Sequence, residues 1–158
     1  MKLKHTKFQK FIEFLTIVLV FALWGYLIMS WNALPNEIPG HYNAAGVVDR
    51  WGSKNELLIM PIIITILYAL LTAVSFFPSI WNVPTKTTEE NIEFVYINLK
   101  TMLILIKMEI VITFTYMMYC SVKMQSLGPW FLPLELIIIF GTIIYYIIKV
   151  YRKNPNTM

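Results

Sequence analysis

The chain has 158 residues, of which 58% are hydrophobic and only 14% are charged, and its formal net charge is +4. An ordinary soluble domain carries about 25% charged and about 45–50% apolar residues. This composition excludes a small soluble monomer and predicts an integral membrane protein, while the single cysteine, Cys120, excludes an intrachain disulfide.

The first apolar run covers residues 11–31 and follows the basic segment MKLKHTKFQK. A basic start is typical of a signal peptide, but the run is too long for one and no small-residue cleavage pattern follows, so we expect an uncleaved span. Three further runs reach the length of about 20 residues that a spanning helix needs, at residues 57–81, 101–122 and 130–148. The sequence therefore predicts an all-α fold, a bundle of four transmembrane helices forming a single membrane domain over residues 1–158.

The connection between the first two spans, residues 32–56, contains the longest polar stretch in the first half of the chain. Pro35 and Pro39 fix their own φ and push the preceding residues to extended conformations, so we expect residues 34–39 to be extended. The sequence NAAG at residues 43–46 predicts a turn, and DRWG at residues 49–52 predicts a second one. Such regular turn chemistry indicates a structured loop rather than a flexible linker.

The end of this loop predicts the start of the second helix. Ser53 is followed three residues later by Glu56, directly before the second apolar run. This spacing is that of a capping box, in which each side chain bonds the backbone N–H of the other residue. We expect the helix to begin at about Lys54.

The string LPNEIPGHYNAAGVVDRWGSK, residues 34–54, closely resembles the LPxxIPxHxNxxGxxDxWGSK loop of a family of small bacterial membrane proteins catalogued as a domain of unknown function. The same module forms the N-terminal part of the immunity protein against the Bacillus sporulation-delaying toxin. The resemblance covers the loop and its two flanking spans, about the first eighty residues. The matching residues are Leu34, Pro35, Ile38, Pro39, His41, Asn43, Gly46, Asp49, Trp51, Gly52, Ser53 and Lys54.

The resemblance implies that the loop recognises a ligand, such as a secreted peptide toxin. The candidate binding residues are Pro35, Pro39, His41, Asn43, Gly46, Asp49, Trp51, Gly52 and Lys54. The alternative is structural: His41, Asn43 and Asp49 would hold the turns through side-chain to backbone hydrogen bonds. We expect no metal, cofactor or catalytic residue, because zinc sites usually use several histidines or cysteines and no nucleophile stands beside His41. The protein is predicted not to be an enzyme.

Basic residues are distributed unevenly between the two predicted faces. The two tails and the loop at residues 82–100 carry nine lysines and arginines, whereas the opposite face carries three. The positive-inside rule therefore predicts both termini and loop 82–100 in the cytoplasm, and loop 32–56 outside a bacterial cytoplasmic membrane that the chain crosses four times. The tails are short and lack interleaved aromatic residues, so their expected partner is the lipid bilayer and not nucleic acid.

The third span contains two charged residues, Lys107 and Glu109, about 200° apart around a helix. A capping box at residues 87–90 predicts a helix start near Thr88, which places Lys107 close enough to the cytoplasmic face to extend its amine there. Glu109 shares its face with Thr113 and Tyr116, and this polar seam should face the bundle interior. The seam would either hold the helices together through interhelical hydrogen bonds or have a proton- or ion-linked function.

Two other acidic residues, Glu13 and Glu135, lie nearer the span ends and are predicted to reach the interface. The leading hypothesis is a multi-pass protein whose outer loop recognises a ligand in an immunity or signalling role. The alternatives are an accessory or regulatory subunit of another membrane protein, or a small transporter or membrane enzyme that uses Glu109.

Overall fold

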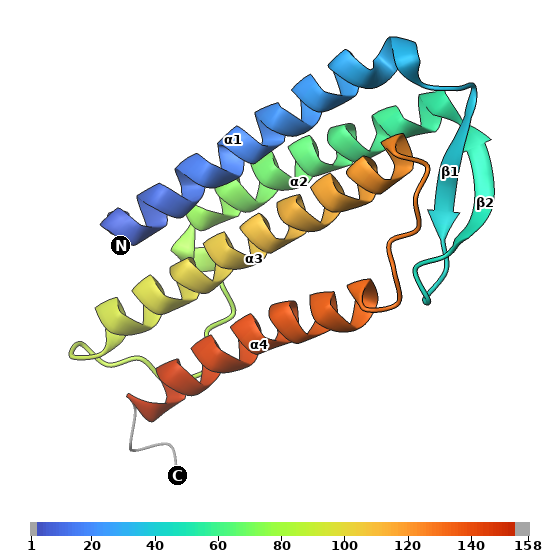
Figure 1. Cartoon of the computed structure of the whole chain (residues 1–158). Coiled ribbons are helices and arrows are strands. Elements are labelled where there is room, and N and C mark those ends of the chain that lie inside the picture. Colours follow the sequence, from blue (N-terminus) through green and yellow to red (C-terminus); the bar gives the residue numbers. More distant parts are fainter. Residues whose placement is uncertain (1–2, 154–158) are drawn as a thin grey trace.

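The structure is a computed structural model that describes residues 3–153, so that Lys2 of the predicted basic tail lies outside the described residues. Four helices run back and forth along one another: α1 (Lys7–Ser30), α2 (Ile59–Ser75), α3 (Ile92–Val122) and α4 (Phe131–Arg152) (Figure 1). The first and last described residues lie at the same end of the bundle, which we call the terminal end. The opposite end, which carries a two-stranded sheet, is the hairpin end.

All four helices are long and apolar enough to cross a membrane, over Lys7–Ala33, Lys54–Ser75, Ile92–Val122 and Phe131–Arg152. The prediction of four helices with the length and apolar composition of membrane spans is thus confirmed. The first helix begins where a capping box forms: the Thr6 hydroxyl accepts a hydrogen bond from the Gln9 backbone N–H at 3.1 Å, and the Gln9 side chain accepts one from the Thr6 N–H at 3.0 Å.

The connection between α1 and α2 is a β-hairpin, so the fold is mostly helical rather than all-α as predicted. Strands β1 (Glu37–Tyr42) and β2 (Val48–Ser53) pair antiparallel. The predicted second turn at DRWG is wrong, because these residues lie within β2. Pro39, Gly40 and Gly52 hide the alternation of apolar and polar residues by which strands are usually recognised. The strand register shifts twice, between Pro39 and His41 and between His41 and Tyr42.

The predicted start of the second helix is correct, although the first turn is tighter than expected. Ser53 and Glu56 form the predicted capping box. The chain then passes through a 3₁₀ helix, η2 (Lys54–Leu58), before the α-helical hydrogen bonds of α2 begin at Ile59. A short 3₁₀ turn of this kind is frequent at the beginning of an α-helix.

The start of α3 differs from the prediction. The backbone N–H of Thr88 donates to the Asn91 side chain at 2.8 Å, and α3 begins at Ile92, four residues after Thr88. The predicted start near Thr88 is therefore four residues too early, whereas the prediction that the helix begins inside the loop at residues 82–100 is correct. With 31 residues and a rise of about 1.5 Å per residue, α3 is about 46 Å long, which exceeds the hydrocarbon thickness of about 30 Å.

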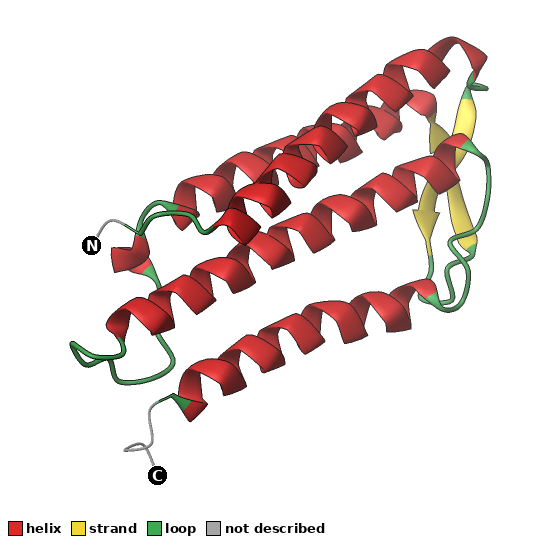
Figure 2. Ribbon diagram, turned by 60° about the vertical axis from the view of Figure 1, so that its left-hand side comes forward, coloured by secondary structure: helices red, strands yellow, loops and turns green. Residues whose placement is uncertain are grey.

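Helix α3 lies at the centre of the bundle and packs against all three other helices, whereas α4 packs mainly against α3 (Figure 2). The main core joins α1, α2, α3 and the hairpin through Val20, Leu23, Leu27, Leu34, Ile38, Leu57, Ile64, Val111 and Met118. A smaller cluster at the terminal end joins α3 and α4 through Val95, Leu99 and Val150. Ile38 of β1, together with Leu34 three residues before this strand, therefore anchors the sheet in the main core.

Candidate functional site

The hairpin turn is organised by Asn43 and Gly46. The Asn43 side-chain oxygen accepts hydrogen bonds from the backbone N–H groups of Ala45 at 3.0 Å and Val47 at 3.1 Å. Gly46 has a φ of 72°, a conformation that glycine adopts without steric cost. Both predicted site residues thus shape the turn.

The turn is attached to the connection between α3 and α4. The Leu127 N–H donates to the Gly46 carbonyl at 2.8 Å, and a Cβ at Gly46 would collide with the Gly128 carbonyl oxygen. The Tyr42 hydroxyl lies 3.0 Å from the Ser121 hydroxyl and donates to the Gln125 carbonyl at 3.2 Å. Burial raises the pKa of Tyr42 above its ordinary value. The hairpin is therefore fixed to the end of the bundle by polar contacts as well as by its apolar anchor.

His41 and Asp49 pair with each other across the two strands. The His41 Nδ1 lies 2.6 Å from the Asp49 Oδ1, and the two side chains retain 63% and 41% of their exposure. The structural alternative considered for the loop therefore holds for Asn43, whereas His41 and Asp49 bond to each other. An exposed pair of this kind contributes little to stability, typically about 0–1 kcal/mol. Because both side chains are exposed, a ligand could contact them.

Arg50 is a site residue that sequence analysis missed. Its Nη2 donates to the Gly40 carbonyl at 2.9 Å and to the Glu56 carboxylate at 2.8 Å. A Cβ at Gly40 would approach the guanidinium to 3.1 Å, and one at Gly52 would approach the Glu56 carboxylate to 2.5 Å. The two glycines therefore leave room for this ion pair, and because the strands were not predicted, the sequence offered no sign of it.

The remaining predicted loop residues divide into buried and exposed ones. Pro39 is buried, Pro35 is exposed, and Lys54 places its amine 5.2 Å from the centre of the Trp31 ring. Trp51 retains 52% of its exposure in the middle of β2. The hairpin thus presents an aromatic side chain together with the His41–Asp49 pair on a backbone that is held in place.

The intramembrane charges lie on two different sides of α3, as the helical spacing predicts. Lys107 is 1% exposed, and its amine donates to the Glu13 carboxylate at 2.6 and 2.7 Å and to the Thr72 hydroxyl at 2.8 Å. It also lies 4.7 Å from the centre of the Tyr68 ring. The predictions that Lys107 extends to the cytoplasmic face and that Glu13 reaches the interface are wrong, because α1 and α2 supply partners for the amine inside the bundle.

The other side of α3 forms a seam with α4 in which acids meet hydroxyl groups. Thr142 donates to Glu109 at 2.5 Å, and Thr113 donates to Glu135. The second Glu109 carboxyl oxygen is buried without a hydrogen-bond partner among the described residues. The predicted grouping of Glu109 with Thr113 on an interior face is correct, but Tyr116, predicted on the same face, is 41% exposed. Glu135 turns toward α3 instead of reaching the interface.

Residues 3–153 contain no group of three or more histidine, cysteine, aspartate or glutamate side chains placed to hold a metal ion. The chemistry available at the hairpin is therefore that of an exposed aromatic ring and paired charges. In the seam between α3 and α4, the available groups are the carboxyl groups of Glu109 and Glu135, with threonine hydroxyl groups and aromatic rings around them.

The fold and these sites define a four-helix membrane protein with a hairpin fixed to one end. A family model described as "Domain of unknown function (DUF1648)" matches residues 18–65, which include most of α1, the hairpin and the start of α2. An uncharacterised protein of Archaeoglobus fulgidus is 32% identical over 78 residues, covering 44% of this chain and 43% of that protein. The chain thus matches less than half the length of this relative. No solved structure matches.

Proposed function

We propose that the hairpin is a recognition surface for a secreted peptide, in an immunity or signalling role, and that it binds without catalysing a reaction. The observation that carries this proposal is the exposure of Trp51, His41 and Asp49 on a hairpin that is fixed to the bundle by Gly46 and Tyr42. A rigid aromatic side chain offers contact area at low entropic cost, which suits peptide binding. The resemblance of residues 34–54 to the loop of toxin-immunity modules supports a toxin as the peptide.

This role requires the hairpin to face outward. We propose that both termini lie in the cytoplasm of a bacterial cell and that the hairpin lies outside the cytoplasmic membrane, since the basic residues gather at the terminal end. Ala45 is exposed at the hairpin tip and Cys120 is buried. A membrane-impermeant thiol reagent applied to intact cells should label Ala45→Cys in a Cys120→Ser background, and it should not label Thr88→Cys.

The direct test is protection of a sensitive bacterium. Cells that produce the protein should survive secreted peptide toxins that kill cells without it, and Trp51→Ala should remove the protection. Glu90→Ala, at the terminal end, is the matched control and should protect like the wild type. Absence of protection against every peptide tested, in cells where the chain is inserted, would contradict the immunity role.

A second candidate function is that of an accessory subunit docked along α4. Val150 is the one buried residue among those of α4, and its exposed apolar side chains include Ile137, Phe140 and Ile144. An exposed apolar helix face can contact lipid or another membrane protein. Co-purification of a stoichiometric partner from native membranes, lost on Phe140→Ala and unaffected by Trp51→Ala, would favour this function over peptide recognition.

A further inference from the structure

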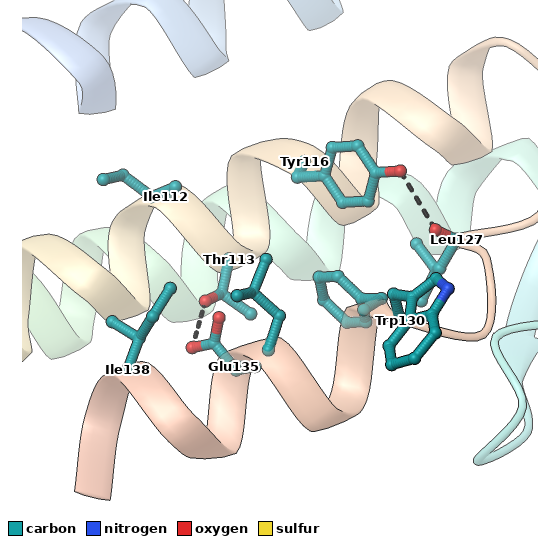
Figure 3. Close-up of a pocket in the computed structure, with 9 residues that line it drawn as sticks. Ile112, Thr113, Tyr116, Leu127, Trp130, Glu135 and Ile138 are labelled. Atoms are coloured by element: carbon teal, nitrogen blue, oxygen red, sulfur yellow. Dashed lines mark hydrogen bonds between the residues drawn. The ribbon is translucent and has the colours of Figure 1, made fainter. Parts of the chain in front are cut away.

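A cavity of about 350 Å³ lies between α3 and α4 at the hairpin end of the bundle (Figure 3). Ligand pockets for small molecules measure about 300–1,000 Å³ and combine apolar walls with a few convergent polar groups. The side chains that matter for the argument are Thr113, Tyr116, Trp130, Phe131 and Glu135. Both the size and the lining are therefore those of a small-molecule site.

The walls of the cavity present aromatic rings. Tyr116 stacks on Phe131, with ring centres 5.4 Å apart. The Tyr116 hydroxyl donates to the Leu127 carbonyl at 3.0 Å, so its hydrogen is already used. Trp130 retains 80% of its exposure beside them. Aromatic faces carry a negative quadrupole and attract cations, more strongly where water is excluded.

The charge in the cavity is negative and has no counter-ion among the described residues that line it. Glu135 is the charged residue of the lining, and it accepts a hydrogen bond from the Thr113 hydroxyl. Farther along the seam, the Thr142 hydroxyl donates to Glu109, and the other Glu109 oxygen is buried without a hydrogen-bond partner among residues 3–153. An acidic residue inside a membrane span is costly unless it finds a compensating group. A bound cation would supply that group for Glu135.

We propose that this cavity binds an amphipathic organic cation, an ammonium group joined to an apolar or aromatic body. The ammonium would contact the Glu135 carboxylate, and the body would pack against Tyr116, Phe131 and Trp130. A neutral lipid chain would gain nothing from the carboxylate. A metal cation requires several oxygen ligands, and the lining offers only one carboxylate.

The site is independent of peptide recognition, because it uses none of the exposed hairpin residues. Its test uses the full chain in nanodiscs of zwitterionic lipid, titrated with benzyltrimethylammonium and with neopentylbenzene, its uncharged carbon isostere. Empty nanodiscs correct for partitioning into lipid. We expect calorimetry to show saturable binding of the cation only. Glu135→Gln should weaken binding about thirtyfold or more, because breaking a buried charged pair costs about 2 kcal/mol or more.

Two further variants keep the test decisive. Glu37→Gln removes an exposed hairpin carboxylate and should bind the cation like the wild type. Trp130→Leu keeps the acid and removes an aromatic face, so it should bind about threefold more weakly or worse. If Glu135→Gln does not fold, as judged by circular dichroism, Trp130→Leu and the isostere decide. Equal binding of the isostere, equal binding by Glu135→Gln or Trp130→Leu, or no saturable binding at millimolar cation would overturn the proposal.

Discussion

The two sides of α3 place ionisable residues inside the bundle in opposite ways. Toward α1 and α2, Lys107 is almost fully buried and is neutralised by Glu13. Toward α4, Glu109 and Glu135 are held by threonine hydroxyl groups, with no basic residue among their hydrogen-bond partners in the described chain. The comparison shows that one helix can carry a charge-paired side, on which a lysine and a carboxylate pair, and an acidic side, on which carboxyl groups are hydrogen-bonded by threonine hydroxyl groups.

The charge-paired side offers the largest expected effect. Lys107→Met leaves Glu13 inside the bundle without its cation, and the loss of one partner of a buried pair typically costs about 3–5 kcal/mol. The free energy of unfolding, measured by titration of a micellar sample with a denaturing detergent, should fall by about this amount. The double variant Lys107→Met with Glu13→Gln should recover most of the loss, because no charge remains unpaired.

Lys123→Met is the matched control for this substitution. It makes the same chemical change at the end of the same helix, where Lys123 is exposed, and it should change the free energy of unfolding by less than about 0.5 kcal/mol. A Lys107→Met protein as stable as the Lys123→Met protein would remove the distinction between the two sides of α3.

The acidic side depends on the hairpin, because the loop that leads into α4 is bound to Gly46. Gly46→Ala forces alanine to a positive φ and drives its Cβ toward the Gly128 carbonyl. We expect the free energy of unfolding to fall by about 2 kcal/mol. The Leu127 N–H, which donates to the Gly46 carbonyl, should exchange its hydrogen faster. Gly25→Ala is the control, since a Cβ there meets nothing within 4 Å. Unchanged exchange at Leu127 would show that the hairpin does not hold this side.

The hydroxyl groups of the acidic seam should contribute less. Thr142→Val removes the donor to Glu109, and interhelical hydrogen bonds of this kind are worth about 0.6 kcal/mol on average. We therefore expect a loss of about 0.6 kcal/mol in the free energy of unfolding. Thr115→Val is the matched control, because the Thr115 hydroxyl bonds only the Val111 carbonyl of its own helix among the described contacts. Equal stability of the two variants would mean that the seam is held by apolar packing alone.

The smallest effect concerns His5, which precedes α1 and lies beside Lys100. Burial, and then the positive charge of Lys100, lower the pKa of His5. Because the folded state binds the proton more weakly than the unfolded state, the stabilisation is present above the ordinary pKa of about 6.5 and is lost as the pH falls below it. The melting temperature should therefore fall slightly between pH 7.5 and 5.5. The fall should disappear in His5→Gln and persist in His41→Gln, which replaces the other histidine.

The four helices and the capping box before α2 could be predicted from sequence because their signals are local. Runs of about 20 apolar residues and the Ser53–Glu56 spacing depend only on neighbouring residues, and all appear in the structure. The hairpin was missed because proline and glycine interrupt its strand pattern. In α3, the Asn91 side chain bonds the backbone of Thr88, so the expected cap at Thr87 gave the wrong helix start.

The partners of the intramembrane charges could not be predicted, because they come from distant parts of the chain. Glu13 and Lys107 are separated by 94 residues, and nothing in their local sequences records the contact. The seam was partly predictable, since Glu109 and Thr113 share a helix face, but the contributions of Glu135 and Thr142 depend on how α4 packs. The same reason explains why the cavity beside Trp130 had no sequence signal.

Helix α4 is held at both of its ends. At the hairpin end, Leu127 and Gly128 lie against the Gly46 turn, and at the terminal end Val150 is buried against Val95 and Leu99. Lateral separation of α4 from the bundle would have to break both attachments at once. Bowing of its middle would also have to break the bonds of Thr142 to Glu109 and of Thr113 to Glu135, and rotation about its own axis would turn Val150 out of its contact. A change at any one of these three places would therefore reach α4 only by loosening the other two.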